Sequence, residues 1–232
     1  MEETFYNRIS RYRSLNDVQP LLMRKVYTWM TLALVITGVT AFGVAASPTL
    51  FMSLHKMIWG LVIAELVLVF SLTCSINRLS LGTATLMFIG YSILNGATLS
   101  SIFYTYDMMV IAKVFFITAG TFGVTAFYGY TTKKNLATLE KVLFMALIGL
   151  LLATVVNLFL KSSSLDYMLS YAGVIIFTGL TAWDMQKIKK VMQQQYEESE
   201  QTQKIALIGA LTLYLDFINL FLYLLKIFGN KK

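Results

Sequence analysis

Residues 210–229 read ALTLYLDFINLFLYLLKIFG, an apolar run with a single acidic residue, Asp216. A helix that crosses a bilayer needs about 20 mostly apolar residues, which this run supplies. Asp216, Asn219 and Tyr223 are spaced i, i+3 and i+7, so one face of the helix carries all three. Leu, Ile and Phe fill most of the other positions. The pattern predicts a helix at the centre of a bundle, with its polar stripe facing a cavity.

The rest of the chain has the same apolar character. Of its 232 residues 57% are hydrophobic and 13% are charged, against about 25% charged in soluble domains. This composition excludes a disordered chain and argues against a soluble domain. Continuous apolar stretches, unlike the alternating strands of an outer-membrane barrel, predict an all-α polytopic membrane protein with seven transmembrane helices. The predicted spans are Val26–Ala46, Lys56–Cys74, Thr83–Tyr104, Ala112–Tyr130, Val142–Leu160, Tyr167–Gln186 and Ile205–Phe228.

Two longer polar segments, residues 1–25 and 187–204, interrupt this pattern. We predict a cytoplasmic N-terminal tail over residues 1–25 and a seven-helix membrane domain over residues 26–229. With the N-terminus in the cytoplasm, thirteen of the 19 Lys and Arg residues fall in inside segments. Basic residues favour the cytoplasmic side, so the N-terminus is predicted inside and the C-terminus outside. Most of the net charge of +7 is then a topology signal, and no nucleic-acid partner is expected.

Three acidic residues, Glu65, Asp184 and Asp216, lie inside apolar runs, whereas the other nine lie in tails, loops or helix ends. An ionised carboxylate at a helix centre costs about 2.5–3.5 kcal/mol on insertion scales. The default interpretation is a functional site that faces the bundle interior. The alternative is a neutral, hydrogen-bonded acid that holds helices together.

Asp184 lies in FTGLTAWDMQKIKK, residues 177–190, near the cytoplasmic end of the sixth span. If Asp184 contacts Asp216, the two carboxyl groups share a proton, because like charges a few ångströms apart do not both ionise. When deprotonated, such a pair is a candidate site for a hard divalent cation such as Ca²⁺. The residues alone place the two aspartates at different depths.

The motifs around these two aspartates resemble those of the Bax inhibitor-1 family, which includes bacterial YetJ-like and YccA-like proteins. LYLDFINLFLYLLKIFG resembles the closing signature of the family, and FTGLTAWDMQKIKK resembles its sixth-helix motif. Weaker similarity covers IAELVLVFSLTCSINRLS, YSILNGATLSSIF and YTTKKNLATLEKVLFMALIGLLLATVVNLFL. The resemblance implies a last helix surrounded by the other six. It also implies a pH-sensitive calcium leak, with Asp184 and Asp216 as the pH-sensing pair and Glu65 as the second-helix acid.

One position departs from the family pattern. The relatives often carry an arginine about eleven residues after the second-helix acid, where it pairs with the aspartates as a latch. Here residues 73–76 read TCSI, and the nearest arginine is Arg78. Two residues rotate a helix by about 200°, which turns Arg78 away from that latch position. Lys187, three residues after Asp184, is an alternative basic group.

Other residues receive structural interpretations. Asn95 and Asn157 are expected to be interhelical hydrogen-bond partners rather than ligands, and Cys74 a small buried residue at a helix end. No enzyme motif is present, so neither catalysis nor a cofactor is expected.

Two functional hypotheses remain. The first is a calcium leak in a bacterial cytoplasmic membrane, whose partners are the lipid bilayer, calcium ions and protons. The second is an interaction protein that modulates a membrane protease, or stress and cell-death machinery, without transport.

Overall fold

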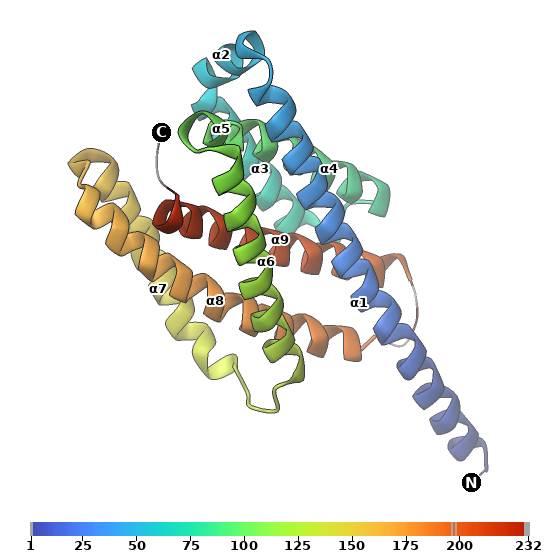
Figure 1. Ribbon diagram of the computed structural model, residues 1–232. Helices are drawn as coiled ribbons and strands as arrows, with labels where there is room; N and C mark the ends of the chain where they lie inside the picture. Colours follow the sequence, from blue (N-terminus) through green and yellow to red (C-terminus); the bar gives the residue numbers. More distant parts are fainter. Residues whose placement is uncertain (1, 196, 198, 230–232) are drawn as a thin grey trace. The chain divides into compact units, whose positions relative to one another are not determined.

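The computed structural model describes residues 2–195, 197 and 199–229, with side chains described from residue 19 onward. Within these residues all regular secondary structure is helical and no β-strand occurs (Figure 1). Among the described residues, seven helices are long and apolar enough to cross a membrane, which confirms the predicted number. The helices are α1 (Glu2–Ala45), α2 (Pro48–Lys56), α3 (Ile58–Ser75), α4 (Leu81–Leu99), α5 (Ile102–Thr105), α6 (Met108–Thr131), α7 (Ala137–Leu160), α8 (Ser163–Gln193) and α9 (Glu200–Phe228).

The contacts divide the chain into two compact units, a division that the sequence did not predict. Unit 1 comprises Met1–Ser101 and Ile188–Tyr214, and unit 2 comprises Ile102–Lys187 and Leu215–Lys232. The first crossing follows the end of α4, where the Ser100 and Ser101 hydroxyl groups donate to backbone carbonyls three residues back. Such side-chain bonds compete with the helical pattern and favour its end. The helices α8 and α9 each contribute residues to both units.

Close packing of α4 against α1 organises unit 1, where both helices lie side by side with α3 and α2 nearby (Figure 1). A Cβ atom placed on Gly96 of α4 would lie 2.6 Å from the backbone oxygen of Thr37 on α1. Only glycine permits this approach, as is usual where membrane helices pack through small residues. The contact lies one residue from Asn95, a polar residue of α4.

Unit 2 contains a similar close approach, between α6 and α8. A Cβ atom on Gly129 of α6 would collide with the backbone carbonyl of Ala182 on α8. Further along α8, the Tyr223 ring of α9 covers Gly173 so closely that no Cβ atom fits, and it stacks on Phe177. At the end of α9 the Lys226 ammonium group donates to Asp166 of α8 over 2.8 Å. The antiparallel segments of α8 and α9 therefore contact each other repeatedly within this unit.

Several helices are longer than their apolar runs predicted. The helix α1 begins at Glu2 rather than at Val26, and its candidate span begins at Gln19. The helix α8 continues to Gln193, seven residues beyond the predicted end of its span, because Ile188 and Met192 are buried and stabilise the extra turns. Asp184 is therefore nine residues inside α8 instead of two. The helix α9 likewise begins at Glu200 rather than at Ile205.

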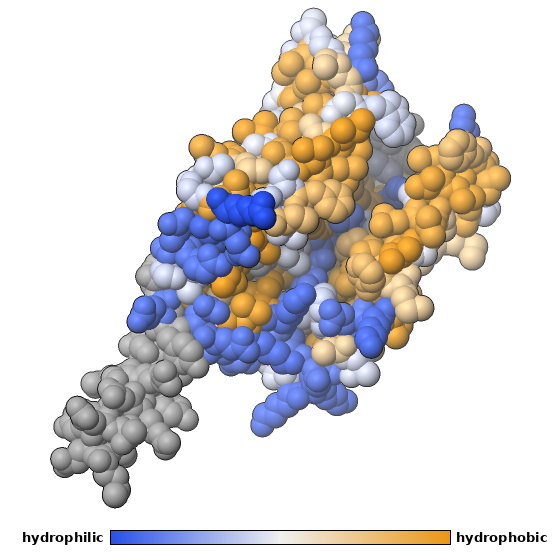
Figure 2. Space-filling model, turned by 180° about the vertical axis from the view of Figure 1, so that it is seen from behind, coloured by the Kyte–Doolittle hydropathy of each residue, from blue (hydrophilic) through white to orange (hydrophobic). Residues whose placement is uncertain are grey.

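The outward-facing side chains are those expected next to lipid. In the most apolar 18-residue windows, 67% of the α9 residues are buried, against 6% in α3 and in α7. Large apolar side chains such as Trp59, Phe116 and Phe159 are exposed, and Figure 2 shows hydrophobic side chains over long stretches of the helices on one face. So much exposed apolar surface requires an apolar solvent. The central position of α9 remains a prediction.

Candidate functional site

The two aspartates predicted to pair do meet, and both belong to unit 2. The Asp184 and Asp216 carboxyl groups lie close enough to interact with each other, and their residues are 8% and 5% exposed. The Oδ2 atom of Asp216 is buried and receives no hydrogen bond from an amide or hydroxyl group of the described residues. Two carboxyl groups form a hydrogen bond only when one of them carries a proton. The geometry therefore fits a proton-sharing pair.

Charged groups of both signs act on this pair from unit 2. Lys187 attracts the charge of Asp184, and Glu140 of α7 opposes it. Lys187 is exposed and its ammonium group lies 4.5 Å from the centre of the Trp183 ring. In the described part of the chain no group of three or more His, Cys, Asp or Glu residues is placed to hold a metal ion. A cation at the pair would thus take most of its oxygen ligands from elsewhere, because Ca²⁺ binds six to eight.

A buried glutamine fixes α8 two residues after Asp184. The Gln186 side chain accepts from the backbone N–H of Leu136 over 3.0 Å and donates to the backbone oxygen of Lys134 over 2.8 Å. Both partners lie in the α6–α7 connection, so this segment is held beside Asp184. Sequence reasoning missed Gln186, although its position two residues after an intramembrane acid was a usable signal.

The other two polar residues of the stripe on α9 have partners of their own. The Asn219 side chain donates to the backbone oxygen of Leu215 over 2.8 Å, within its own helix. The Tyr223 ring packs on Gly173 and Phe177 of α8, and its hydroxyl group faces Thr154 of α7. These contacts give Tyr223 a packing role between α7, α8 and α9.

Glu65 has a different environment, in unit 1. Its Oε1 atom accepts from the Thr98 hydroxyl group, and its Oε2 atom accepts from the Asn95 amide over 3.4 Å. Both donors lie on α4 at i and i+3, on one face of the helix. Each oxygen of this carboxylate therefore has a neutral donor.

The Asn95 side chain extends this arrangement across unit 1. Its Oδ1 atom accepts from the Tyr214 hydroxyl group of α9 over 3.1 Å. The Tyr214 hydroxyl group also lies 2.7 Å from that of Thr37 on α1, which contacts the backbone oxygen of Ser92 over 3.0 Å. Asn95 is thus an interhelical partner, as predicted. Sequence reasoning missed the roles of Thr37, Thr98 and Tyr214, because buried hydroxyl groups are common in membrane helices and carry little signal on their own.

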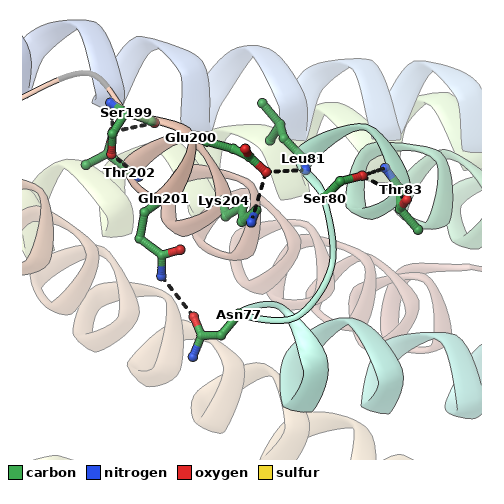
Figure 3. A network of polar contacts seen from close by, with 9 residues as sticks. All are labelled: Asn77, Ser80, Leu81, Thr83, Ser199, Glu200, Gln201, Thr202 and Lys204. Carbon is green, nitrogen blue, oxygen red and sulfur yellow. Dashed lines mark hydrogen bonds and ion pairs between the residues drawn. The ribbon is translucent and has the colours of Figure 1, made fainter.

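A second polar network holds the first turn of α9 in unit 1 (Figure 3). The Glu200 carboxylate accepts from the backbone N–H of Leu81 over 2.9 Å and lies 3.0 Å from the Lys204 ammonium group. Gln201 donates to Asn77 over 2.9 Å. Ser199 and Thr202 each accept the other's backbone N–H, an arrangement that stabilises a helix start. The α3–α4 connection is therefore fastened to the beginning of α9.

Three further residues that the sequence singled out have other surroundings. Arg78 is exposed in the α3–α4 connection of unit 1. The Asn157 side chain accepts from the backbone N–H of Ser162 over 3.1 Å, so it caps the α7–α8 turn instead of joining two spans. Cys74 is exposed, and the expectation that it is buried was wrong. The α3 helix that carries it turns most of its surface outward.

Known proteins are similar to this chain over almost its whole length. Residues 19–232 match the family described as "Inhibitor of apoptosis-promoting Bax1". The chain is 47% identical to the inner membrane protein YbhL of Escherichia coli (strain K12) over 229 residues, which cover 95% of this chain and 98% of YbhL. It is 41% identical to an uncharacterised protein of Rickettsia prowazekii, over 96% of this chain and 95% of that protein. A Borreliella burgdorferi protein is 39% identical over 90% of this chain and 92% of its own length.

Proposed function

Because this chain belongs to the Bax inhibitor-1 family, we propose that it is a pH-sensitive calcium leak channel in which the Asp184–Asp216 pair responds to protons. The observation that carries the proposal is the contact between two buried carboxyl groups on different helices. Buried ionisable groups inside membrane helices are the usual markers of ion pathways. The family membership supports the same assignment.

The chemistry of the pair connects protons with cations. While one proton is shared, the carboxyl groups attract each other and hold α8 against α9. When that proton leaves, two like charges face each other and repel. Ca²⁺ prefers carboxylate oxygens, so a cation in transit relieves this repulsion. Protons and calcium therefore compete for the same oxygens.

The membrane assignment has direct support from the comparisons. The chain is an integral membrane protein, and its relative YbhL is named an inner membrane protein. We propose the bacterial cytoplasmic membrane as its location, with the N-terminus inside and the C-terminus outside, in line with the distribution of basic residues. Calcium ions and protons are its proposed substrates, and no catalytic activity or resident cofactor is proposed.

Reconstitution into liposomes that contain a calcium-sensitive dye tests this proposal. We expect calcium flux through the unmodified protein to change with pH. Asp184→Asn and Asp216→Asn are each expected to abolish that dependence, because an amide exchanges no proton in this range. Asp107→Asn is the matched control, since Asp107 is an exposed acid at the start of α6. Flux that ignores both pH and the two site variants would disprove the proposal.

A second candidate function rests on α1, which begins at Glu2, well before its candidate span starts at Gln19. We propose as the alternative that this extension engages a membrane protease or stress and cell-death machinery, without transport. Deletion of residues 2–18 leaves the buried Leu22 in place. If a cellular phenotype requires this extension but tolerates both Asn variants, partner binding replaces the leak as the function.

A further inference from the structure

Four helices of unit 1 are connected by one series of hydrogen bonds, which ends on a carboxylate. Starting from α1, the series runs from Thr37 to Tyr214 of α9, then to Asn95 of α4 and finally to Glu65 of α3. Thr98 supplies the second donor to Glu65. Tyr214 is fully buried and Thr37 is 3% exposed. The protein surrounds this series well enough to exclude competing water from its central members.

From Tyr214 onward, the donors in this series point toward Glu65. The Asn95 amide N–H donates to the carboxylate, which leaves its carbonyl oxygen to accept from Tyr214. The Tyr214 hydroxyl group donates to Asn95, and its oxygen lies 2.7 Å from that of Thr37, whose single proton faces both Tyr214 and the backbone oxygen of Ser92. Hydrogen bonds that run in one direction polarise and strengthen one another in a medium of low dielectric. The direction here is the one that an ionised Glu65 requires.

We propose that Asn95 and Tyr214 are positioning residues that transmit the charge state of Glu65 to α9. An ionised Glu65 keeps the Asn95 amide turned toward it, and the amide in turn holds the Tyr214 hydroxyl group. A protonated Glu65 is a weaker acceptor, so it no longer fixes the Asn95 side chain. The hydrogen bond between Asn95 and Tyr214 then weakens, and Tyr214 lies on α9 two residues before Asp216. This inference rests on the proposed function, because it adds a second proton-responsive group to the same helix.

Among the groups around Glu65, its own carboxyl group is the one whose charge changes with pH. The titratable groups on which the charge of Glu65 acts, within the described residues of unit 1, are the phenols Tyr91 of α4 and Tyr214 of α9. Both are uncharged across the neutral and mildly acidic range. The partners that Glu65 contacts directly, Thr98 and Asn95, are neutral. Glu65 is therefore the member of this network whose charge responds to acid.

Thermal unfolding of the full chain in lipid nanodiscs tests the proposal without any transport assay. We compare the unmodified protein, Tyr214→Phe, Glu65→Gln and the double variant between about pH 5 and 8. At the alkaline end, Tyr214→Phe is expected to lower Tm by about 2–4 °C, the usual effect of one lost hydrogen bond in a chain of this size. In the Glu65→Gln background the loss should fall below about 1 °C. It should also shrink in the otherwise unmodified protein as pH falls.

Tyr223→Phe is the matched control, because it removes a tyrosine hydroxyl group from the same helix at a position in unit 2, where it faces Thr154 and not the Glu65 network. Its Tm loss should be the same in the Glu65→Gln background as in the unmodified protein, and the same at both ends of the pH range. An equal loss for Tyr214→Phe in both backgrounds and at every pH would overturn the inference. If Glu65→Gln does not fold, the comparison of Tyr214→Phe with the unmodified protein across pH still tests the inference. Because no calcium flux is measured, a failed leak hypothesis cannot be mistaken for a failure here.

Discussion

The buried acid of unit 1 and the buried acids of unit 2 are stabilised in different ways. Glu65 is surrounded by neutral donors, and each of its oxygens accepts a hydrogen bond. Asp216 contacts a second acid, and its Oδ2 atom receives no bond from an amide or hydroxyl group of the described residues. The first arrangement stabilises a carboxylate where it stands. The second holds together only while a proton is present.

This difference separates a role in packing from a role in chemistry. A buried acid whose bonds are satisfied contributes to stability, and its removal leaves its donors unpaired. A buried acid with an unsatisfied oxygen contributes less to stability but is free to exchange its ligand. The helix α9 takes part in both arrangements: Tyr214 belongs to the Glu65 network and Asp216 to the aspartate pair. The two residues are two positions apart and thus lie on roughly opposite faces of the helix.

The largest expected effect contrasts the two acids directly. Glu65→Leu should lower the free energy of unfolding by about 2–4 kcal/mol, because Thr98 and Asn95 each lose an acceptor. Asp216→Leu should have a smaller effect, since Asp184 can become protonated and its partner had an unsatisfied oxygen. Denaturant unfolding in detergent micelles measures both values. An equal or larger loss for Asp216→Leu would contradict the comparison.

A second prediction concerns the close backbone approach beside the aspartates. Gly129→Ala should lower the free energy of unfolding by about 1–3 kcal/mol, because its methyl group collides with the Ala182 carbonyl and separates α6 from α8. Gly123→Ala is the control on the same helix, where a Cβ atom meets open space. It should be neutral or stabilising by up to about 1 kcal/mol. Similar losses for both variants would exclude a specific role for Gly129.

A third prediction uses pH to distinguish the pair from a single acid. As pH rises, the shared proton leaves and two carboxylates repel each other, so the unmodified protein should lose stability. Asp216→Asn keeps a donor for Asp184 and should lose less, with a difference in Tm of about 2–4 °C at alkaline pH. Differential scanning fluorimetry over a pH series measures this. Parallel curves for the two proteins would argue against proton sharing.

The smallest effect is expected at the start of α9. Glu200→Ala removes the contacts with Leu81 and Lys204, but its carboxylate is exposed, so solvent screens its interactions and their contribution to stability is small. Hydrogen exchange should show faster opening of the first turn of α9 with little change in global stability. A loss as large as that of Glu65→Leu would mean that this network, rather than the Glu65 network, holds α9.

Much of this architecture could be predicted from residue patterns alone. The length and continuity of the apolar runs predicted seven spans, and isolation within such runs identified Glu65, Asp184 and Asp216. The contact between the two aspartates followed only from the family resemblance, since the spans drawn from apolarity ended α8 too early. That helix continues to Gln193 because Ile188 and Met192 pack in the interior of unit 1.

The amino-acid sequence by itself determined that this protein lies in a membrane, how many spans it has and which carboxyl groups lie inside them. These properties depend on local composition and on the helical period, which any short segment contains in full. Only the tertiary structure decided that Glu65 meets Thr98 and Asn95 while Asp216 meets Asp184. Which helix faces meet depends on close approaches at residues such as Gly96 and Gly129, and these approaches require two segments that are distant in the chain.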